Sequence, residues 1–193
     1  MLPTLIAAVL SLIIGTPTNP SDDLSLGDPA AKIQVDLYAS PTCIHCANFV
    51  NGVFPAFKAK YVNTGRVHFT LHEFVTPPDV VSEAEWITAR CAGPEKYFQV
   101  IEEFFRNQAK IFEASDTYAI LLEVAKSAGL SETQVLVCLD DPAKRAALKR
   151  RVDTAWAGGI DSFPTFLING VKFEGEMSLA QLDRAIAAAK VVP

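Results

Sequence analysis

The spacing of apolar residues divides the first third of the chain into a strand, a helix and a second strand. Apolar and polar residues alternate over 33–38 and again over 67–75, which predicts two β-strands. Between them, apolar residues recur at helical spacing over about 43–60, and Pro55 should kink or break this helix. Two strands joined through a helix in this way can pair in parallel through a right-handed crossover.

The middle of the chain, residues 80–157, carries helix signals and no convincing strand pattern. Ser82-x-x-Glu85 has the spacing of a capping box and predicts the start of a helix that Gly93 ends. Pro94 predicts the start of the next helix, because proline is favoured in a first turn. Polar caps and glycines indicate three more helices, with starts at Ser115 or Asp116, Ser131 and Asp141 and ends at Gly129 and Gly158.

The β pattern returns near the C-terminus. Asn169-Gly170 lies between two short apolar runs, and this dipeptide is the strongest short signal for a β-hairpin. An amphipathic helix over 178–190 follows. The order of elements therefore predicts an α/β fold in two parts, residues 32–79 and 158–193, interrupted by an all-helical insertion.

Residues 1–20 contain the longest apolar run of the chain, from Leu2 to Gly15. The run is shorter than the roughly 18 to 20 residues that span a bilayer, and its length is typical of the core of a secretory signal. No Lys or Arg precedes it and no clear cleavage site follows, so an uncleaved membrane anchor and a buried N-terminal helix stay open. The polar residues 21–31 predict a linker. Either export interpretation places the rest of the chain outside the cytosol, where disulfides persist.

Composition narrows the function classes. Half of the 193 residues are hydrophobic, which is enough to bury a core and excludes a disordered chain. The formal net charge of −5 argues against nucleic-acid binding, because neutralising phosphates needs a basic face. The four cysteines are too few for a small disulfide scaffold, so their positions matter more than their number.

Cys43-Ile44-His45-Cys46 stands where the first predicted strand passes into a helix. A cysteine at a helix N-terminus meets unpaired main-chain N–H groups and the positive end of the helix dipole, and both favour the thiolate. Cys46 lies one turn deeper, and the His45 imidazole can add positive charge or a hydrogen bond beside the Cys43 sulfur. A stabilised thiolate makes the corresponding disulfide a better oxidant. The motif therefore predicts a redox-active pair.

Two other interpretations of this motif are a purely structural disulfide and half of a zinc site. A zinc site needs a second pair of ligands nearby in sequence, and the remaining cysteines, Cys91 and Cys138, are isolated. We therefore expect no metal. Because buried free thiols are disfavoured in an oxidising compartment, we predict a disulfide between Cys91 and Cys138, with two free cysteines packed as small hydrophobic residues as the alternative.

Phe163-Pro164-Thr165-Phe166 opens the returning β pattern. A proline just before a strand that faces a strand-to-helix CxxC motif suggests a cis peptide bond. Such a bond would turn the backbone of Phe163 toward the cysteines, where its N–H and C=O could pair with an extended substrate. Without the CxxC motif, this proline would be interpreted as an ordinary residue at a strand start.

The two motifs and the helical segment between them resemble the DsbA family of thioredoxin-like thiol–disulfide oxidoreductases, in its alphaproteobacterial branch. The resemblance covers nearly all of the chain from about Lys32 onward and implies a thioredoxin-like fold with an inserted all-helical domain. It also implies a periplasmic enzyme that donates disulfides to reduced exported proteins and is reoxidised by a membrane quinone-linked partner of the DsbB type. By motif position, Cys43 is the attacking and Cys46 the resolving cysteine, with His45 the dipeptide histidine and Pro164 the cis-proline.

The chain departs from the family pattern at three positions. Ile44 stands where the family usually has proline, and Phe163 is bulkier than the Thr or Val that often precedes the cis-proline. Leu37 stands where the family has a buried acid, and Asp36 should face the other side of the sheet. These departures leave open the redox potential, the shape of the substrate groove and the proton acceptor of Cys46.

We therefore expect an exported protein dithiol–disulfide oxidoreductase that acts through Cys43 and Cys46, with Ile44, Phe163 and Thr165 contacting the substrate. We expect a monomer that needs no cofactor and does not bind nucleic acid. The nearest alternative is a reductase or isomerase on the same fold, although such isomerases resemble dimers with a separate N-terminal domain, for which the short linker leaves no room. A non-catalytic, thioredoxin-like binding or chaperone module is the alternative from another class.

Overall fold

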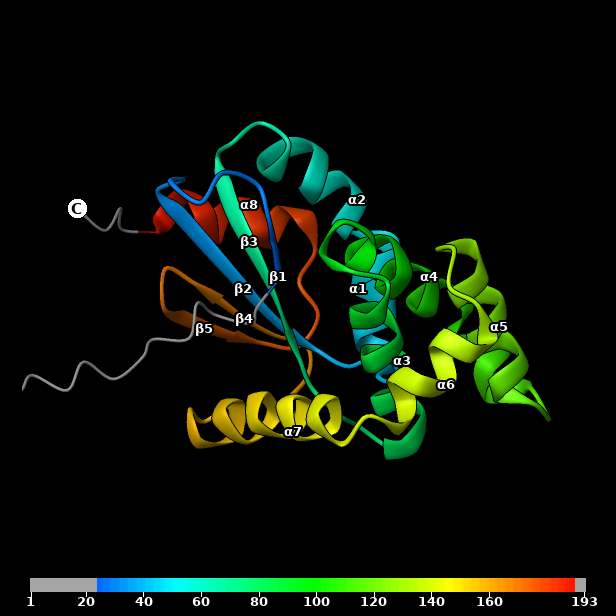
Figure 1. The fold of residues 1–193 in the computed structure, drawn as a ribbon. Coiled ribbons are helices and arrows are strands. Elements are labelled where there is room, and N and C mark those ends of the chain that lie inside the picture. The colour runs from blue at the N-terminus through cyan, green and yellow to red at the C-terminus, as the bar shows by residue number, and fades with distance from the viewer. Residues whose placement is uncertain (1–23, 190–193) are drawn as a thin grey trace, which may run out of the picture.

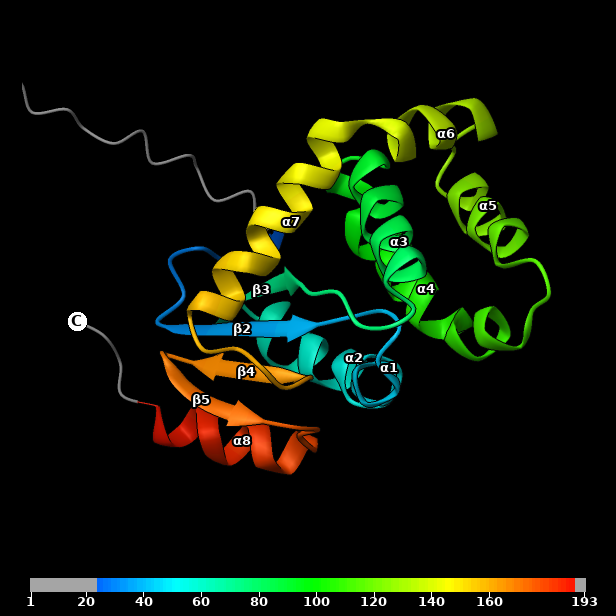
Figure 2. The same cartoon turned by 90° about the horizontal axis from the view of Figure 1, so that it is seen from below.

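A computed structural model of the chain describes residues 24–189 and contains a mixed sheet with helices on both faces (Figures 1 and 2). The described sheet has five strands in the order β1-β3-β2-β4-β5. In chain order the strands are β1 (Leu24–Leu26), β2 (Ile33–Ala39), β3 (Val67–Glu73), β4 (Thr165–Ile168) and β5 (Val171–Glu174). β2 and β3 are parallel, β1 is antiparallel to β3, and the β4–β5 hairpin is antiparallel to β2. The predicted parallel pair and hairpin are thereby confirmed.

The first helical segment is broken near Pro55, as the sequence predicts. It divides into α1 (Ile44–Gly52), α2 (Phe54–Phe57) and a π-helical turn, η1 (Lys58–Val62). Pro55 lies in the first turn of α2, where its missing N–H leaves no helical hydrogen bond unmade. The break turns the chain so that Phe54, Phe57 and Tyr61 are all buried in the main core.

Successive residues of β2 face two different cores, because side chains alternate across a sheet. Val35 and Leu37 are buried in the main core together with residues of α1 and of α8 (Leu179–Ala188). Tyr38 faces the opposite side, where Phe74 and Ala155 form a smaller cluster with α7 (Pro142–Ala157). Figures 1 and 2 accordingly show α7 on one face of the sheet and α1, α2 and α8 on the other.

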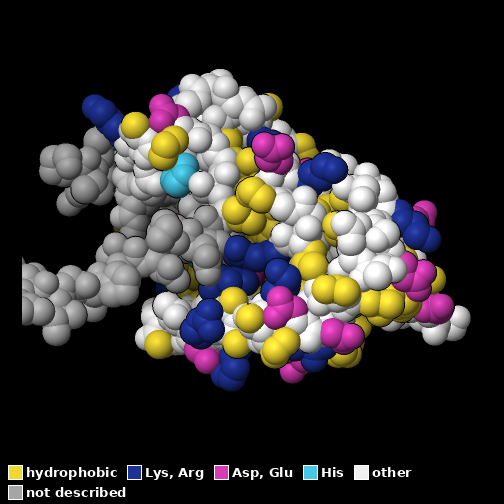
Figure 3. Space-filling view, in the orientation of Figure 1, with side chains coloured by type: hydrophobic (Ala, Val, Ile, Leu, Met, Phe, Trp, Pro, Cys, Tyr) yellow, Lys and Arg dark blue, Asp and Glu magenta, His cyan; other side chains and the backbone are white. Residues whose placement is uncertain are grey.

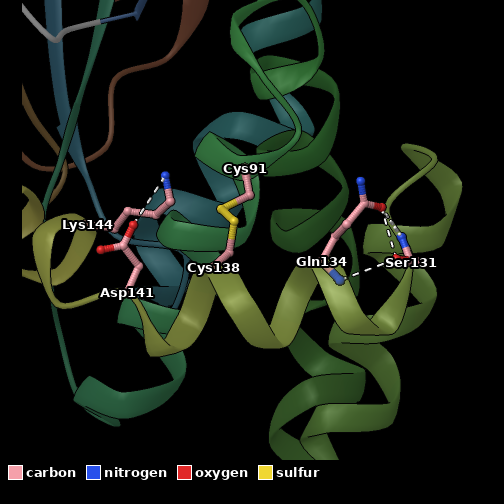
Figure 4. Close-up of a disulfide and its surroundings, with 6 residues drawn as sticks. All are labelled: Cys91, Ser131, Gln134, Cys138, Asp141 and Lys144. Atoms are coloured by element: carbon pink, nitrogen blue, oxygen red, sulfur yellow. Dashed lines mark hydrogen bonds and ion pairs between the residues drawn. A yellow bond between two sulfur atoms is a disulfide. The ribbon is translucent and has the colours of Figure 1, made fainter.

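The helical insertion lies beside the sheet and packs around α4. The four helices before α7 are α3 (Asp79–Cys91), α4 (Pro94–Glu113), α5 (Thr117–Ser127) and α6 (Glu132–Asp140). The apolar face of α4 is buried along its length, and its buried residues are Tyr97, Phe98, Val100, Ile101, Phe104, Phe105 and Ile111. A disulfide joins Cys91 of α3 to Cys138 of α6, with 6.4 Å between the Cα atoms (Figure 4). This is the pair that the sequence analysis favours, and it fixes α6 against α3.

The three polar helix starts predicted after residue 114 are all confirmed by side-chain caps. Asp116 accepts a hydrogen bond from the Ala119 N–H at the start of α5, and Ser131 forms a capping box with Gln134 at the start of α6. The Asp141 carboxylate caps α7 through the Ala143 N–H. These local signals worked because each cap satisfies a main-chain N–H of its own helix.

The predicted helix start at Ser82 is wrong. Helix α3 begins earlier, at Asp79, and the Ser82 N–H already donates to the Pro78 carbonyl within the first turn. The Ser82 hydroxyl is buried and bonds to Ser40 Oγ at 2.8 Å, 42 residues away. Glu85 is also buried, and burial raises the pKa of its carboxyl group to about 8. The S-x-x-E spacing therefore reflects two buried positions one turn apart instead of a capping box.

The segment 21–31, predicted as a linker, contains β1. Leu24 and Leu26 are partly buried against the main core, while Ser25 is exposed. The chain then turns at Gly27, where φ is +89° and a Cβ atom would lie 2.4 Å from the Val67 carbonyl oxygen. Only glycine fits this close approach, which allows a three-residue strand to pair with β3.

A buried ionic cluster joins the sheet to α3, α4 and α7. The Glu73 carboxylate at the end of β3 is fully buried and accepts hydrogen bonds from Arg90 Nε, the Tyr97 hydroxyl and Arg151 Nε. The Arg151 Nε to Glu73 Oε2 distance is 2.7 Å, and the Tyr97 hydroxyl lies 3.1 Å from Glu73 Oε1. Arg90 and Arg151 also line a pocket between α3 and α7 with Lys144. In the space-filling view, which shows the molecule in the orientation of Figure 1, Lys and Arg side chains gather in the middle of the visible face, above α7 (Figure 3).

Among the helices of residues 24–189, none combines the length and the apolar character needed to cross a membrane. The apolar run Leu2–Gly15, predicted as an export signal, lies outside the described residues.

Candidate active site

Cys43 is the N-cap residue of α1, at the point where the chain leaves β2. Its N–H donates to the Ser40 carbonyl at 3.0 Å, and its carbonyl accepts the first helical hydrogen bond from Ala47 at 3.0 Å. Cys43 is partly exposed, whereas Cys46, one turn further, is fully buried. Both thiols are free. The fold thus presents one sulfur to solvent and keeps its neighbour beneath it.

The loop before Cys43 is held by side chains from elsewhere in the chain. Gln108 Nε2 of α4 donates to the Pro41 carbonyl at 2.5 Å, and this amide is buried. The Thr42 hydroxyl donates to the Thr76 carbonyl at 2.7 Å, and Ser40 Oγ bonds to Ser82 Oγ of α3. The helical insertion therefore positions the residues that lead into the cysteine pair.

The pKa values of the two cysteines are shifted in opposite directions. The hydrogen bond from the Cys46 thiol, assisted by the main-chain N–H groups of Cys46 and His45 and the His45 charge, lowers the pKa of Cys43 to about 6, against the effect of its partial burial. Burial, reinforced by the nearby Cys43 sulfur, raises the pKa of Cys46 well above its ordinary value. At pH 7, a pKa of about 6 leaves about nine tenths of Cys43 as thiolate. The arrangement can therefore hold one thiolate and one thiol in the same pair.

The second sequence motif reaches the cysteines from β4. The Phe163–Pro164 peptide bond is cis, as the sequence analysis expects, and the Phe163 carbonyl oxygen lies 3.7 Å from Cys43 Sγ. The Phe163 ring packs on Phe74 with 3.9 Å between the ring centroids, and Phe74 in turn contacts the half-exposed Trp156. The bulk of Phe163 is thus directed toward α7, and its main chain faces Cys43.

The other predicted substrate contacts differ in accessibility. The Ile44 side chain is exposed beside Cys43. Thr165 is fully buried, and its hydroxyl donates to the Ser162 carbonyl at 2.7 Å, so its side chain is not available to a substrate. Thr165 and Phe166, the first two residues of β4, are both buried, so this end of the strand is covered on both faces.

Leu37, at the position where the DsbA family pattern has a buried acid, is buried in the same core as Cys46. Asp36 lies on the opposite face, as predicted, and its carboxylate is 2.9 Å from His72 Nε2. Within residues 24–189, the groups that shift the pKa of Cys46 are Cys43, the Ser40 N–H and, at longer range, Glu176. Asp36 therefore does not stand in for the family's buried acid.

One charged group of the site, Glu176, is not among the residues predicted from the sequence. Its Oε1 atom accepts hydrogen bonds from His45 Nδ1 at 2.5 Å and from Asn48 Nδ2 at 3.0 Å. The hairpin contained a signal for the position of Glu176. The pairing of Thr165 with Glu174 brings the chain back next to Pro164 at the end of β5. The residues that follow β5 must then lie next to the cysteine motif.

Among the described residues, no group of three or more His, Cys, Asp or Glu side chains is placed to hold a metal ion. The groups that lower the pKa of Cys43 are the Cys46 thiol, the main-chain N–H groups of Cys46 and His45, and the His45 charge.

Comparison with known proteins identifies the family to which this site belongs. The family model described as thioredoxin matches residues 19–188. The chain belongs to the thioredoxin family. Among solved structures, alpha-DsbA1 of Wolbachia pipientis aligns with a TM-score of 0.79 and 27% identity over 86% of this chain and 90% of that one. DsbA of Chlamydia trachomatis shares the fold, with a TM-score of 0.72 and 22% identity over 89% of this chain and 93% of that one. The predicted thioredoxin-like fold with a helical insertion is confirmed.

Curated relatives extend the comparison at the level of sequence. A protein of Rickettsia bellii, provisionally named a protein-disulfide oxidoreductase, is 29% identical over 174 residues, which are 88% of this chain and 66% of that protein. A Rickettsia typhi protein with the same provisional name is 29% identical over 168 residues, 86% of this chain and 61% of that protein. This thioredoxin-family chain thus spans less than two thirds of the length of the curated relatives that it matches.

Proposed function

We propose that the chain is an exported dithiol oxidant of the DsbA type, which introduces disulfides into reduced proteins through Cys43 and Cys46. The observation that carries the proposal is the lowered pKa of Cys43 next to the raised pKa of Cys46. An accessible thiolate at Cys43 and a buried thiol at Cys46 form a stable reduced state. Stabilising the reduced state makes the disulfide a strong oxidant.

The exchange begins with attack of a client thiolate on the Cys43 sulfur of the Cys43–Cys46 disulfide. The electron pair of the broken S–S bond passes to Cys46, which takes up a proton because burial raises its pKa. The second client thiolate then attacks the client sulfur of the mixed disulfide, and Cys43 leaves as a thiolate. The client loses two electrons and two protons in total, of which one proton stays on Cys46 and the other is released to solvent.

Client binding uses the main chain beside Cys43. The Phe163 backbone lies next to the reactive sulfur, and an extended client segment can pair with it in the manner of strand addition. The exposed Ile44 side chain supplies apolar contact on the other side of Cys43. This placement keeps the scissile disulfide at the centre of the contact.

We further propose that the protein acts in the periplasm or another extracytoplasmic space, as a monomer reoxidised by a quinone-linked membrane oxidase of the DsbB type. The apolar run Leu2–Gly15 supports export. The disulfide between Cys91 and Cys138 supports an oxidising compartment. The resemblance to the DsbA family supports the oxidase as partner.

The equilibrium redox potential of the Cys43–Cys46 pair tests the proposal directly. Titration against glutathione should give a value well above that of thioredoxin, which is about −270 mV. Reduced ribonuclease should be oxidised by the wild-type protein and not by a Cys43→Ser variant. A potential at or below that of thioredoxin would favour a reductase, and rapid rescue of scrambled ribonuclease without added oxidant would favour an isomerase. Retention of function by the Cys43→Ser variant would favour the binding module.

A further inference from the structure

The His45 imidazole is bonded to a carboxylate that lies 131 residues away in sequence. Glu176 Oε1 is 2.5 Å from His45 Nδ1, and both side chains of this contact are exposed. Asn48, one helical turn after His45, donates to the same oxygen at 3.0 Å. Two donors from one face of α1 therefore fix the position of a single carboxylate oxygen.

The chain segment that carries Glu176 is fixed on both sides. The Gly175 N–H donates to the Pro164 carbonyl at 2.8 Å, so the segment is bonded to the residue that forms the cis peptide. Met177 is buried, and Ser178 begins the capping box of α8. The backbone of Glu176 is thus held in a defined position beside His45, which reduces the entropy lost when the carboxylate bonds to the imidazole.

The neighbouring acid on β5 makes a different contact. Glu174 Oε1 is 2.5 Å from Lys172 Nζ on the same strand. Both acids are exposed, and they are two residues apart. They carry the same charge, so Glu174 is a matched reference for the charge of Glu176 without its bond to His45.

We propose that Glu176 is a positioning residue that keeps the His45 imidazolium charged and oriented beside Cys43, and thereby makes the Cys43–Cys46 pair more oxidising near neutral pH. The inference deepens the proposed function, on which it rests, by assigning a regulator to the same site. Glu176 acts on the sulfur through His45 and does not touch the reacting atoms.

The sign of the effect follows from two opposing electrostatic contributions. The hydrogen bond and charge of Glu176 raise the pKa of His45, which extends the positively charged imidazolium to higher pH, and this positive charge favours the Cys43 thiolate. The carboxylate charge by itself disfavours a nearby thiolate, as it does for Cys46. Among the described residues, the titratable groups that act on His45 are Glu176 and Cys43, and those that act on Cys43 are Cys46 and His45. Because the His45 charge is among the causes that lower the pKa of Cys43 and the Glu176 charge is not, the indirect effect should exceed the direct one.

The test compares Glu176→Gln with Glu174→Gln in the reduced full-length protein. In Glu176→Gln, imidazole proton shifts measured by NMR should give a lower pKa for His45, and thiolate absorbance at 240 nm should give a higher pKa for Cys43. The equilibrium constant for reduction of the Cys43–Cys46 disulfide by glutathione at pH 7 should fall by about two- to five-fold, the upper part of the range for an exposed ion pair. Glu174→Gln should leave all three quantities unchanged. Below about pH 6 the loss should narrow, since His45 is then protonated without help.

A His45→Ala background separates the indirect effect from the direct one. If Glu176 acts through His45, adding Glu176→Gln to His45→Ala should not raise the pKa of Cys43 further. The inference is overturned if Glu176→Gln lowers the pKa of Cys43 or leaves it unchanged, or if it raises this pKa equally in the His45→Ala background. Both titrations use the reduced protein and need no client. A wild-type potential at or below that of thioredoxin would therefore overturn the proposed function and leave the comparison between variants valid.

Discussion

The ionic cluster around Glu73 gives a quantitative prediction about stability. Arg151→Met keeps much of the length and apolar stem of the side chain on α7 and removes the guanidinium, which bonds Glu73 Oε2 through Nε and a terminal nitrogen. The Glu73 carboxylate is fully buried, whereas its ligand Arg151 is 15% exposed. The substitution therefore leaves a buried carboxylate with one of its two cationic partners missing.

The size of the loss follows from the remaining contacts. Removing one partner of a buried ion pair costs about 3 to 5 kcal/mol when the other charge is left uncompensated. Here the Arg90 guanidinium and the Tyr97 hydroxyl still bond to Glu73 Oε1, so the charge stays partly compensated. We expect the free energy of unfolding to fall by about 2 to 3 kcal/mol.

Lys149→Met on the same helix is the matched control. Lys149 pairs with Asp153 at 2.7 Å, but the two side chains are 73% and 57% exposed. An exposed pair at this spacing contributes about 0.3 to 0.5 kcal/mol, so the control should lose no more than this. Urea denaturation of both variants, with the Cys91–Cys138 disulfide intact, measures the difference. A loss in Arg151→Met within about 0.5 kcal/mol of the control would refute the reasoning, because the cluster would then behave as a surface contact.

Two further predictions concern the cysteines. The reduced protein should gain stability relative to the oxidised protein as pH rises from about 6 to about 9. The reason is that folding lowers the pKa of Cys43 from 9.0 to about 6, and the oxidised protein lacks this titration. A stability difference between the two forms that stays constant over this pH range in urea denaturation would contradict the prediction. The double substitution Cys91→Ala and Cys138→Ala should lower the free energy of unfolding by up to about 4 kcal/mol, the loop-entropy value for a sequence separation of 47; a loss below about 1 kcal/mol would show that the disulfide does not constrain the unfolded chain in this way.

Features whose physical cause is local were predicted well from the sequence. The Asn169-Gly170 turn requires positive φ at both residues, and these are +46° and +80° in the structure. The caps at Asp116 and Ser131 satisfy N–H groups within three residues of themselves. Such features need no knowledge of the tertiary fold, because the partners lie in the same short segment.

Polar side-chain contacts between residues far apart in sequence escaped prediction. The spacing of Ser82 and Glu85 matches a capping box, but Ser82 bonds to Ser40 on another element. Glu73 looks like an ordinary charged strand end until α3 and α7 bring two arginines to it. Glu176 was missed for the same reason, since its partner His45 is 131 residues away. Polar pairs of this kind have no periodicity, and only the completed fold brings them together.

The contact between Gln108 and the Pro41 carbonyl has a consequence for cooperativity. The carbonyl is buried and its donor is a side chain of α4, so opening the insertion would leave a buried acceptor without a partner. The loop that sets the first turn of α1 therefore shares one unfolding unit with the helices beside it. Native-state hydrogen exchange should show the amides around Cys43 and those of α4 opening at the same free energy. A thioredoxin core excised from this chain would lose that shared unit, and with it the fixed helix terminus on which the low pKa of Cys43 depends.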